Sequence, residues 1–306
     1  MKKVLVATVK PFAPAAIKEI KKVTDKAGYK LDLLEKYEDQ ANLLEAIKET
    51  DALIIRSDKI TRDVLDAAQN LKIVVRAGAG YDNIDLDAAT AKGVVAMNTP
   101  GQNSNAVAEL AIGLMVYMAR NLFNGKPGTE LKGKTMGIHA FGHVGRLVGN
   151  LAKGFGMKVY AYDPFIPAKE IEKEGVIAVQ KVEDLYKNAQ YLSLHIPVTE
   201  KTHESINYDL LSLMPTGATL VNTARKEVIH EPSLLRILAE RKDFRYVSDI
   251  APDNANQIIA EYSERAFFTP KKMGAQTAEA NINAGIAAAS QIVDYFEKGD
   301  VRFKVN

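Results

Sequence analysis

The sequence predicts an α/β protein with two doubly wound parallel sheets. Short runs rich in Val, Ile and Leu alternate along the chain with helix-length amphipathic segments. Because these runs are apolar on both faces, they are typical of parallel strands that helices cover on both sides. The length of 306 residues exceeds what one small core usually holds, and this favours two domains.

The predicted elements follow one another in βα alternation, as expected for parallel sheets. The expected strands are residues 3–9, 52–57, 72–78, 94–100, 135–141, 158–163, 191–197, 219–225 and 245–250. The clearest helices are expected at residues 103–120, 143–154, 231–240 and 277–297. The segment 121–135 is rich in Gly, Lys and Pro, so its composition predicts a domain boundary.

The composition narrows the possible partners and the location. Forty basic and 38 acidic residues give a formal charge of +2 without a basic stripe, so neither nucleic acid nor a membrane surface is an expected partner. The absence of cysteine excludes disulfides and thiolate metal sites, and the histidines lack metal-ligand spacing. The chain opens on a strand-like run rather than a signal peptide, so a reducing cytoplasm is the expected location.

Residues 134–163 carry the strongest chemical signal. A predicted strand runs into a turn, a helix and a second strand, which is the setting of the dinucleotide fingerprint G-x-G-x-x-G. The fingerprint positions are Ala140, Gly142, His143, Val144 and Gly145, so an alanine replaces the first glycine. We expect the backbone at Gly142 to approach a pyrophosphate, which the amides of the helix N-terminus would bind.

Asp163 ends the second strand of this unit and predicts the type of dinucleotide. A carboxylate at that strand end binds the ribose hydroxyls and repels a 2′-phosphate, so it favours NAD over NADP. The alternative is a solvated turn residue that precedes Pro164.

Motifs across nearly the whole chain point to one family. They are IIRSDKIT (54–61), VVRAGAGYDNIDLDAA (74–89), NTPGQNSNAVAELAIGL (98–114), FGHVGR (141–146), SLHIPVTEKT (193–202), LVNTARKEVI (220–229) and TPKKMGAQTAEA (269–280). Together they resemble the D-isomer-specific 2-hydroxyacid dehydrogenases. The resemblance implies a flavodoxin-like substrate domain formed by residues 1–98 and 274–306, a Rossmann NAD-binding domain formed by residues 99–273, and a homodimer.

The resemblance also implies roles for individual residues. Arg225 matches the family's catalytic arginine, whose planar guanidinium binds the carboxylate of a 2-oxo acid and polarises its carbonyl; the alternative is a surface ion pair. The positions that match the family's substrate pocket are Arg56, Ser57, Ala79, Gly80 and Asn103. The positions that match its cofactor contacts are His195, Pro197, Thr223, Ala224, Asp249 and Gly274. Arg56 would meet a phosphate, and the alternative there is a helical turn that Ser57 caps.

The sequence departs from the family at the acid/base. The family pairs a His with a Glu, which raises the pKa of the imidazole. The Glu position falls on Asn254, and the His position falls on Lys271 or Lys272, depending on the side from which the motif is aligned. An ammonium group needs no carboxylate to stay charged, while Arg225 and desolvation would lower its pKa toward a useful value. One of the two lysines is therefore the expected acid/base, and solvated loop charges are the alternative.

The resemblance implies, as the expected reaction, the NAD-dependent oxidation of 3-phosphoglycerate to 3-phosphohydroxypyruvate, the entry step of serine synthesis. Arg56 near Lys59 favours such a small phosphorylated 2-hydroxy acid as substrate. Two alternatives stay open, namely a reductase of an unphosphorylated 2-oxo acid such as glyoxylate, hydroxypyruvate or pyruvate, and a non-catalytic NAD-sensing protein. Arg225 argues against the second alternative. The chain ends shortly after its last predicted helix, so serine feedback through a C-terminal regulatory module is not expected.

Overall fold

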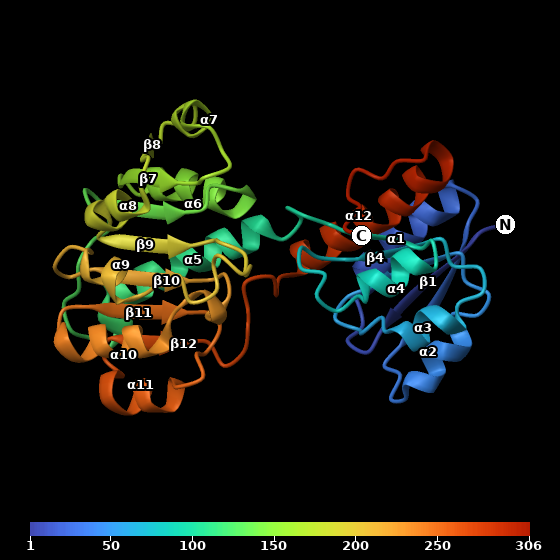
Figure 1. The fold of residues 1–306 in the computed structure, drawn as a ribbon, viewed down its shortest axis with the longest axis horizontal. Helices are drawn as coiled ribbons and strands as arrows, with labels where there is room; N and C mark the ends of the chain where they lie inside the picture. The colour runs from blue at the N-terminus through green and yellow to red at the C-terminus, as the bar shows by residue number, and fades with distance from the viewer. The chain divides into compact units, whose positions relative to one another are not determined.

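The chain forms two compact units in the computed structural model, which describes all residues from 1 to 306 (Figure 1). One unit contains Met1–Asn103 and Gln276–Asn306, and the other contains Ser104–Ala275. The first division lies five residues beyond the expected position at residue 98, and the second lies two residues beyond 273. Residues that follow the last strand of the first unit stay with it, since the Thr99 amide donates to the Gly78 carbonyl at 2.9 Å.

The first unit is built on a five-stranded sheet. Its strands are β1 (Lys3–Thr8), β2 (Lys30–Glu35), β3 (Ala52–Ile55), β4 (Ile73–Arg76) and β5 (Val95–Asn98). All of them pair in parallel in the order β2-β1-β3-β4-β5. This order is flavodoxin-like, and it reverses between β1 and β3, where ligands bind in sheets of this kind.

Helices cover both faces of this sheet. α1 (Pro14–Lys26) and α12 (Ala278–Lys298) pack side by side on one face, although they come from opposite ends of the chain (Figure 1). α2 (Gln40–Ala46), α3 (Arg62–Ala67) and α4 (Leu86–Ala91) bury their apolar residues against the other face. Burial on both faces explains the continuous apolar runs of the inner strands. No helix in either unit combines the length and the apolar character that a membrane span requires.

The second unit is built on a seven-stranded parallel sheet. Its strands are β6 (Thr135–His139), β7 (Lys158–Tyr162), β8 (Ile177–Ala178), β9 (Tyr191–Leu194), β10 (Thr219–Asn222), β11 (Arg245–Ser248) and β12 (Ala266–Phe268). They pair in the order β12-β11-β10-β9-β6-β7-β8. This is the Rossmann order with one strand added, and it reverses between β6 and β9. The predicted fold class, two doubly wound parallel sheets, is confirmed.

The helices of the second unit also lie on both faces of its sheet. α5 (Ser104–Ala119), α6 (His143–Gly154) and α7 (Ala168–Glu172) pack into one core. α8 (Val182–Asn188), α9 (Tyr208–Ser212), α10 (Glu231–Glu240) and α11 (Ala255–Tyr262) pack into the other, and single 3₁₀ turns form at Asn121–Phe123 and Lys226–Val228. The predicted bounds of α6 and α10 are confirmed, and those of α5 and α12 differ by one residue at each end.

Three strands escape prediction, and all three lie at sheet edges. β2 borders the first sheet, and β8 and β12 border the second. β2 alternates charged and apolar residues (KLDLLE) because part of it faces solvent, while β8 and β12 contain two and three residues. The continuous apolar run that marks an inner parallel strand is therefore missing from each of them.

The expected boundary at residues 121–135 is wrong, because this segment lies within the second unit. Leu131 is buried in the core beside α5, and the Thr129 amide donates to the Ala119 carbonyl at 2.8 Å. Arg245 fixes the start of the segment, since its guanidinium donates to the Met118 carbonyl at 2.6 Å and to Asn121 Oδ1 at 3.0 Å. The Gly, Lys and Pro composition here marks a loop packed on the domain surface.

The turn between β6 and α6 is packed tightly. Ala140 has a φ of 78°, a left-handed conformation that favours glycine. A Cβ atom on Gly145 would lie 2.3 Å from the Ala140 carbonyl oxygen and 3.0 Å from Ile138. The helix can therefore start this close to the strand only when residue 145 lacks a side chain.

We predict that Gly145→Ala lowers the free energy of unfolding by about 1–3 kcal/mol, because the added methyl group forces the Ala140 backbone to move. Gly154→Ala is the matched control at the end of the same helix, where a Cβ meets no atom within 4 Å. The control should be neutral or stabilising by up to about 1 kcal/mol. Urea unfolding of both variants measures the difference, and a Gly145→Ala protein as stable as the wild type would contradict the packing.

Where β6 and β9 end side by side, His139 is buried and His195 is half-buried. The Nδ1 atom of His139 lies 3.2 Å from the hydroxyl of the fully buried Tyr186, so His139 has a polar partner within the core. The Nε2 atom of His195 is buried without a hydrogen-bond partner. Burial lowers the pKa of His139 to about 4, and burial together with the neighbouring His139 lowers the pKa of His195 to about 3.

We predict that acid destabilises this unit through these histidines. In the unfolded chain both imidazoles bind a proton near pH 6.5, whereas in the folded chain they bind one only near pH 4 and pH 3. The free energy of unfolding therefore falls as the pH drops from 6.5 toward 4. Each histidine contributes a slope of about 1.4 kcal/mol per pH unit in this window. Urea unfolding across the window should show a shallower slope for His139→Asn, whereas the exposed His203→Asn keeps the wild-type slope. Equal slopes for all three proteins would refute the assignment.

Candidate active site

The predicted site residues gather just beyond the carboxyl ends of the strands in both sheets. In the second unit they follow β6, β7, β9, β10, β11 and β12, as predicted for a ligand site on an open parallel sheet. In the first unit they follow β3, β4 and β5. Each unit thus has one set of polar groups at the carboxyl ends of its strands.

The fingerprint turn presents an open backbone at the N-terminus of α6. Gly142 is the N-cap residue and is exposed, and a Cβ atom there would meet nothing within 4 Å. His143 and Val144 form the first turn of the helix, where the backbone N–H groups lack intrahelical partners. The combination of free N–H groups, a helix dipole and open space is suited to an anion such as a phosphate.

Asp163 is held beside this turn by backbone donors. One carboxylate oxygen accepts from the Phe141 amide at 2.8 Å, and the other accepts from the Phe165 amide at 2.8 Å. The residue therefore links the end of β7 to the fingerprint turn, which a merely solvated turn residue would not do. Each oxygen keeps a lone pair for a further donor.

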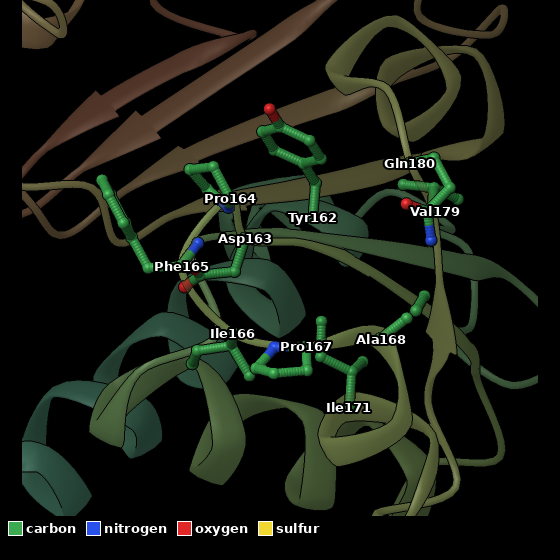
Figure 2. Close-up of a pocket in the computed structure, with 11 residues that line it drawn as sticks. Tyr162, Asp163, Pro164, Phe165, Ile166, Pro167, Ala168, Ile171, Val179 and Gln180 are labelled. Atoms are coloured by element: carbon green, nitrogen blue, oxygen red, sulfur yellow. Dashed lines mark hydrogen bonds between the residues drawn. The ribbon is translucent and has the colours of Figure 1, made fainter.

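A cavity of about 430 Å³ borders Asp163 on the side of β8. Figure 2 shows the loop from Pro164 to Ala168 curving around it, with Val179 on the opposite side. The lining residues are Tyr162, Asp163, Pro164, Phe165, Ile166, Pro167, Ala168, Ile171, Ala178, Val179 and Gln180. Asp163 is the charged residue of this set, and no basic side chain lines the cavity.

Unpaired polar atoms lie at the ends of β9, β10 and β11. Asp249 is fully buried; its Oδ2 atom accepts from the Gly274 amide at 2.7 Å, whereas its Oδ1 atom has no partner. Burial raises the pKa of this carboxyl, and the Gly274 amide opposes that rise. Thr223 Oγ1 and His195 Nε2 are likewise buried without partners, while Pro197 is exposed. Buried polar atoms are usually satisfied, so the three unpartnered atoms at these strand ends mark a candidate ligand site.

Arg225 and Lys272 meet at one carbonyl oxygen. The Ala224 carbonyl accepts from Arg225 Nη1 at 3.0 Å and from Lys272 Nζ at 2.8 Å. The loop after β10 and the loop after β12 thus bring the two cations together. Arg225 forms no ion pair, so the alternative of a surface ion pair does not describe it.

Both candidate lysines are exposed, so the expected desolvation is found at neither, and the two differ in their contacts. The Lys271 backbone carbonyl accepts from the Thr269 hydroxyl at 2.7 Å, whereas Lys272 Nζ donates to the Ala224 carbonyl. Asn254 is the N-cap residue of α11, and its Oδ1 atom is buried without a partner. The side chain at this position is neutral, while the Asn254 backbone amide donates to Glu231 Oε2 at 3.1 Å.

Asn222 builds the turn that carries Arg225 and is missed by sequence reasoning. It is fully buried, its Oδ1 atom accepts from the Ala224 amide at 3.0 Å, and its Nδ2 atom donates to the Arg225 carbonyl at 2.9 Å. The motif NTAR contains it, but only the structure shows that both ends of the side-chain amide are used. Glu231 is also missed; it accepts from the amides of Asp253 and Asn254 and thereby fixes the loop after β11.

In the first unit Arg56 is held entirely by neutral acceptors. Its guanidinium donates to the Lys10 and Pro11 carbonyls at 3.2 and 3.1 Å and to Asn281 Oδ1 at 2.5 Å. Burial lowers the pKa of this guanidinium, and the charge of Asp58 opposes that effect. A partly buried cation without a bound carboxylate is suited to an anionic ligand.

The other predicted pocket residues of the first unit lie on its loops. Ser57 is exposed and caps no helix, because the next helix, α3, has Thr61 as its N-cap, so the capping alternative is wrong. Ala79 and Gly80 follow Gly78, and the Ala79 carbonyl accepts from Asn98 Nδ2 at 2.6 Å. Asn103 is half-buried at the end of this part of the unit.

Comparison with known proteins identifies the family. Residues 114–270 match the D-isomer specific 2-hydroxyacid dehydrogenase family over its NAD binding domain. The structure of NAD⁺-bound 3-phosphoglycerate dehydrogenase from Entamoeba histolytica is similar, with a TM-score of 0.89, 47% identity and coverage of 100% of this chain and 98% of the other.

Curated relatives agree with this match. D-3-phosphoglycerate dehydrogenase of Methanocaldococcus jannaschii is 39% identical over 82% of this chain, but the alignment covers only 50% of that protein, so this chain spans about half its length. Hydroxypyruvate reductase of Thermotoga maritima is 36% identical over 86% of this chain and 90% of its own. On these matches the chain belongs to the D-isomer-specific 2-hydroxyacid dehydrogenase family.

Proposed function

We propose that this protein oxidises D-3-phosphoglycerate to 3-phosphohydroxypyruvate with NAD, the first step of serine synthesis. The observation that carries the proposal is the shared Ala224 carbonyl, which brings the Arg225 guanidinium and the Lys272 ammonium together. A carboxylate clamp and a proton carrier are the two groups that the oxidation of a 2-hydroxy acid needs from the protein. Similarity to phosphoglycerate dehydrogenases supports the choice of substrate.

The residues of the second unit fit NAD. The unpaired Asp249 Oδ1 suits the N–H of a nicotinamide carboxamide, and Thr223 lies beside it at the end of the neighbouring strand β10. The open backbone at Gly142 suits the pyrophosphate, and the Asp163 carboxylate suits the ribose hydroxyls. The cavity beside Asp163 offers no cation to a 2′-phosphate, and this supports NAD rather than NADP.

The chemistry then divides between the cofactor and three side chains. NAD, when bound, accepts the hydride that leaves C2 of the substrate. Arg225 binds the carboxylate through a planar pair of N–H donors and favours the carbonyl that forms at C2. The neutral amine of Lys272 takes up the proton of the C2 hydroxyl, and in the reverse direction its ammonium group returns that proton. A neutral Asn254 in place of a carboxylate avoids holding Lys272 permanently in the charged form.

Arg56 supports a phosphorylated substrate. Its guanidinium is partly buried, and the acceptors that hold it are neutral. It follows β3 at the point where the strand order of that sheet reverses. A guanidinium in such a place binds phosphate more strongly than an exposed lysine does, because it is already oriented and partly desolvated.

A second candidate function is the reduction of unphosphorylated hydroxypyruvate. The similarity to hydroxypyruvate reductase of Thermotoga maritima, which this chain covers over 90% of its length, favours it. Both functions use the same Arg225, Lys272 and cofactor residues and differ in the use made of Arg56. A comparison of substrates therefore separates them.

We predict that the purified protein reduces NAD with D-3-phosphoglycerate and prefers it to D-glycerate and D-lactate by roughly ten- to hundredfold in kcat/KM. This ratio corresponds to one charge-assisted phosphate contact.

We predict that Lys272→Met lowers kcat by about 10²–10⁴-fold, because the proton carrier is lost. Lys271→Met is the matched control and should keep its turnover. Full activity of Lys272→Met would refute the proton role, and a preference for unphosphorylated acids would favour the second function.

We predict that Asp163→Asn shifts the cofactor preference toward NADP. The asparagine can still accept a hydrogen bond from the Phe141 amide but no longer repels a 2′-phosphate, so the ratio of kcat/KM for NAD to that for NADP should fall by roughly tenfold or more. Adding Phe165→Arg, a change on the exposed rim of the cavity, should lower the ratio further. Steady-state kinetics with both cofactors measures it, and an unchanged ratio would remove Asp163 from the ribose site.

A further inference from the structure

The strand order of the first sheet reverses between β1 and β3, and two loops meet beyond the ends of these strands. One loop contains Val9, Lys10 and Pro11, and the other contains Arg56 and Asp58. The Arg56 guanidinium binds the carbonyls of Lys10 and Pro11, so the position of the first loop decides where this guanidinium lies.

Asp58 ties the same two loops together from the other side. Its side chain is 6% exposed, and its Oδ1 atom accepts from the Val9 amide at 2.8 Å and from the Tyr37 hydroxyl at 2.8 Å. Tyr37 comes from the loop after β2, so one carboxylate oxygen joins the loops that follow β1, β2 and β3. Burial and the bond to Asp58 raise the pKa of the Tyr37 hydroxyl, which therefore stays a donor.

Asn83 binds the backbone of the loop that carries Arg56 and Asp58. Asn83 Nδ2 donates to the Asp58 carbonyl at 2.7 Å and to the Arg56 carbonyl at 3.4 Å. The Arg56 Cζ atom also lies 5.1 Å from the centre of the Phe12 ring. Phe12 belongs to the loop whose first residue, Val9, is bound to Asp58. Asp58 makes no ion pair with Arg56 and accepts none of its N–H groups, and its charge favours the charged form of the guanidinium, which raises the pKa that burial lowers.

We propose that Asp58, through Val9 and Tyr37, is a positioning residue that sets the Arg56 guanidinium for the phosphate of the substrate. The inference rests on the proposed function and assigns a specificity role to residues outside the expected pocket. A buried carboxylate that only stabilised the fold would affect all substrates alike. A carboxylate that positions Arg56 affects the phosphorylated substrate alone.

The test compares Asp58→Ala with Asp58→Asn, Tyr37→Phe and Arg56→Gln. Asp58→Ala should raise KM for D-3-phosphoglycerate by roughly tenfold with little change in kcat and none in KM for D-glycerate. Asp58→Asn keeps an oxygen acceptor and should restore most of the affinity, while Tyr37→Phe should be intermediate. On an Arg56→Gln background, Asp58→Ala should add almost nothing, because the group that it positions is gone. Asp63→Ala, at an exposed aspartate on α3, is the matched control.

A crystal structure of Asp58→Ala gives a readout that needs no activity. We expect the Arg56 guanidinium to lose its contacts with the Lys10 and Pro11 carbonyls. The proposal is overturned if these contacts persist, if KM rises equally for both acids, or if the Arg56 and Asp58 changes add. Should the wild-type protein oxidise no 2-hydroxy acid, the proposed function fails, and the crystal structure still decides whether Asp58 positions Arg56.

Discussion

The candidate site of the second unit is organised around one oxygen atom. The Ala224 carbonyl accepts from both Arg225 and Lys272, which would otherwise repel each other. Two like charges can lie this close because one carbonyl oxygen accepts from both of them. An anionic ligand would lower their repulsion further. Asn222 holds this carbonyl in place through both ends of its amide, and Ser248 in turn donates to the Asn222 carbonyl at 2.8 Å. The two cations are therefore oriented by buried neutral groups rather than by carboxylates.

The same design recurs in the first unit. Arg56 is fixed by carbonyl oxygens and the Asn281 amide, while the nearby negative charge of Asp58 is used on backbone and hydroxyl donors. Neutral acceptors orient a guanidinium without cancelling its charge, so the attraction for a dianionic ligand is retained. In both units the polar groups behind the cations are buried, which strengthens their hydrogen bonds and limits the motion of the loops.

The sequence allowed the architecture to be predicted, and it allowed the candidate site residues to be assigned to the loops after the strands, because both follow from short-range patterns. Inner strands are continuous apolar runs, and the candidate residues come soon after them, as Arg225 does after β10 and Asp163 after β7. The edge strands and the packed segment 121–135 lack such patterns. The distinction between Lys271 and Lys272 depends on the bond from Thr269 to the Lys271 carbonyl, which no motif encodes. Asp58 and Tyr37 are 21 residues apart, and Arg56 and Asn281 are 225 apart, so their contacts exist only in the folded chain.

The left-handed Ala140 has a consequence for how the cofactor domain works. Alanine is disfavoured at a φ of 78° by roughly 1–2 kcal/mol, so its surroundings rather than its own preference keep the turn in this shape. The Ala140 amide donates to the Tyr162 carbonyl at 2.9 Å, and the space beside its carbonyl is too small for a side chain at residue 145. The turn thus has this shape without a bound nucleotide. A turn that already has its bound shape loses little conformational entropy when a diphosphate binds. The strained turn can therefore act as a preformed binding site.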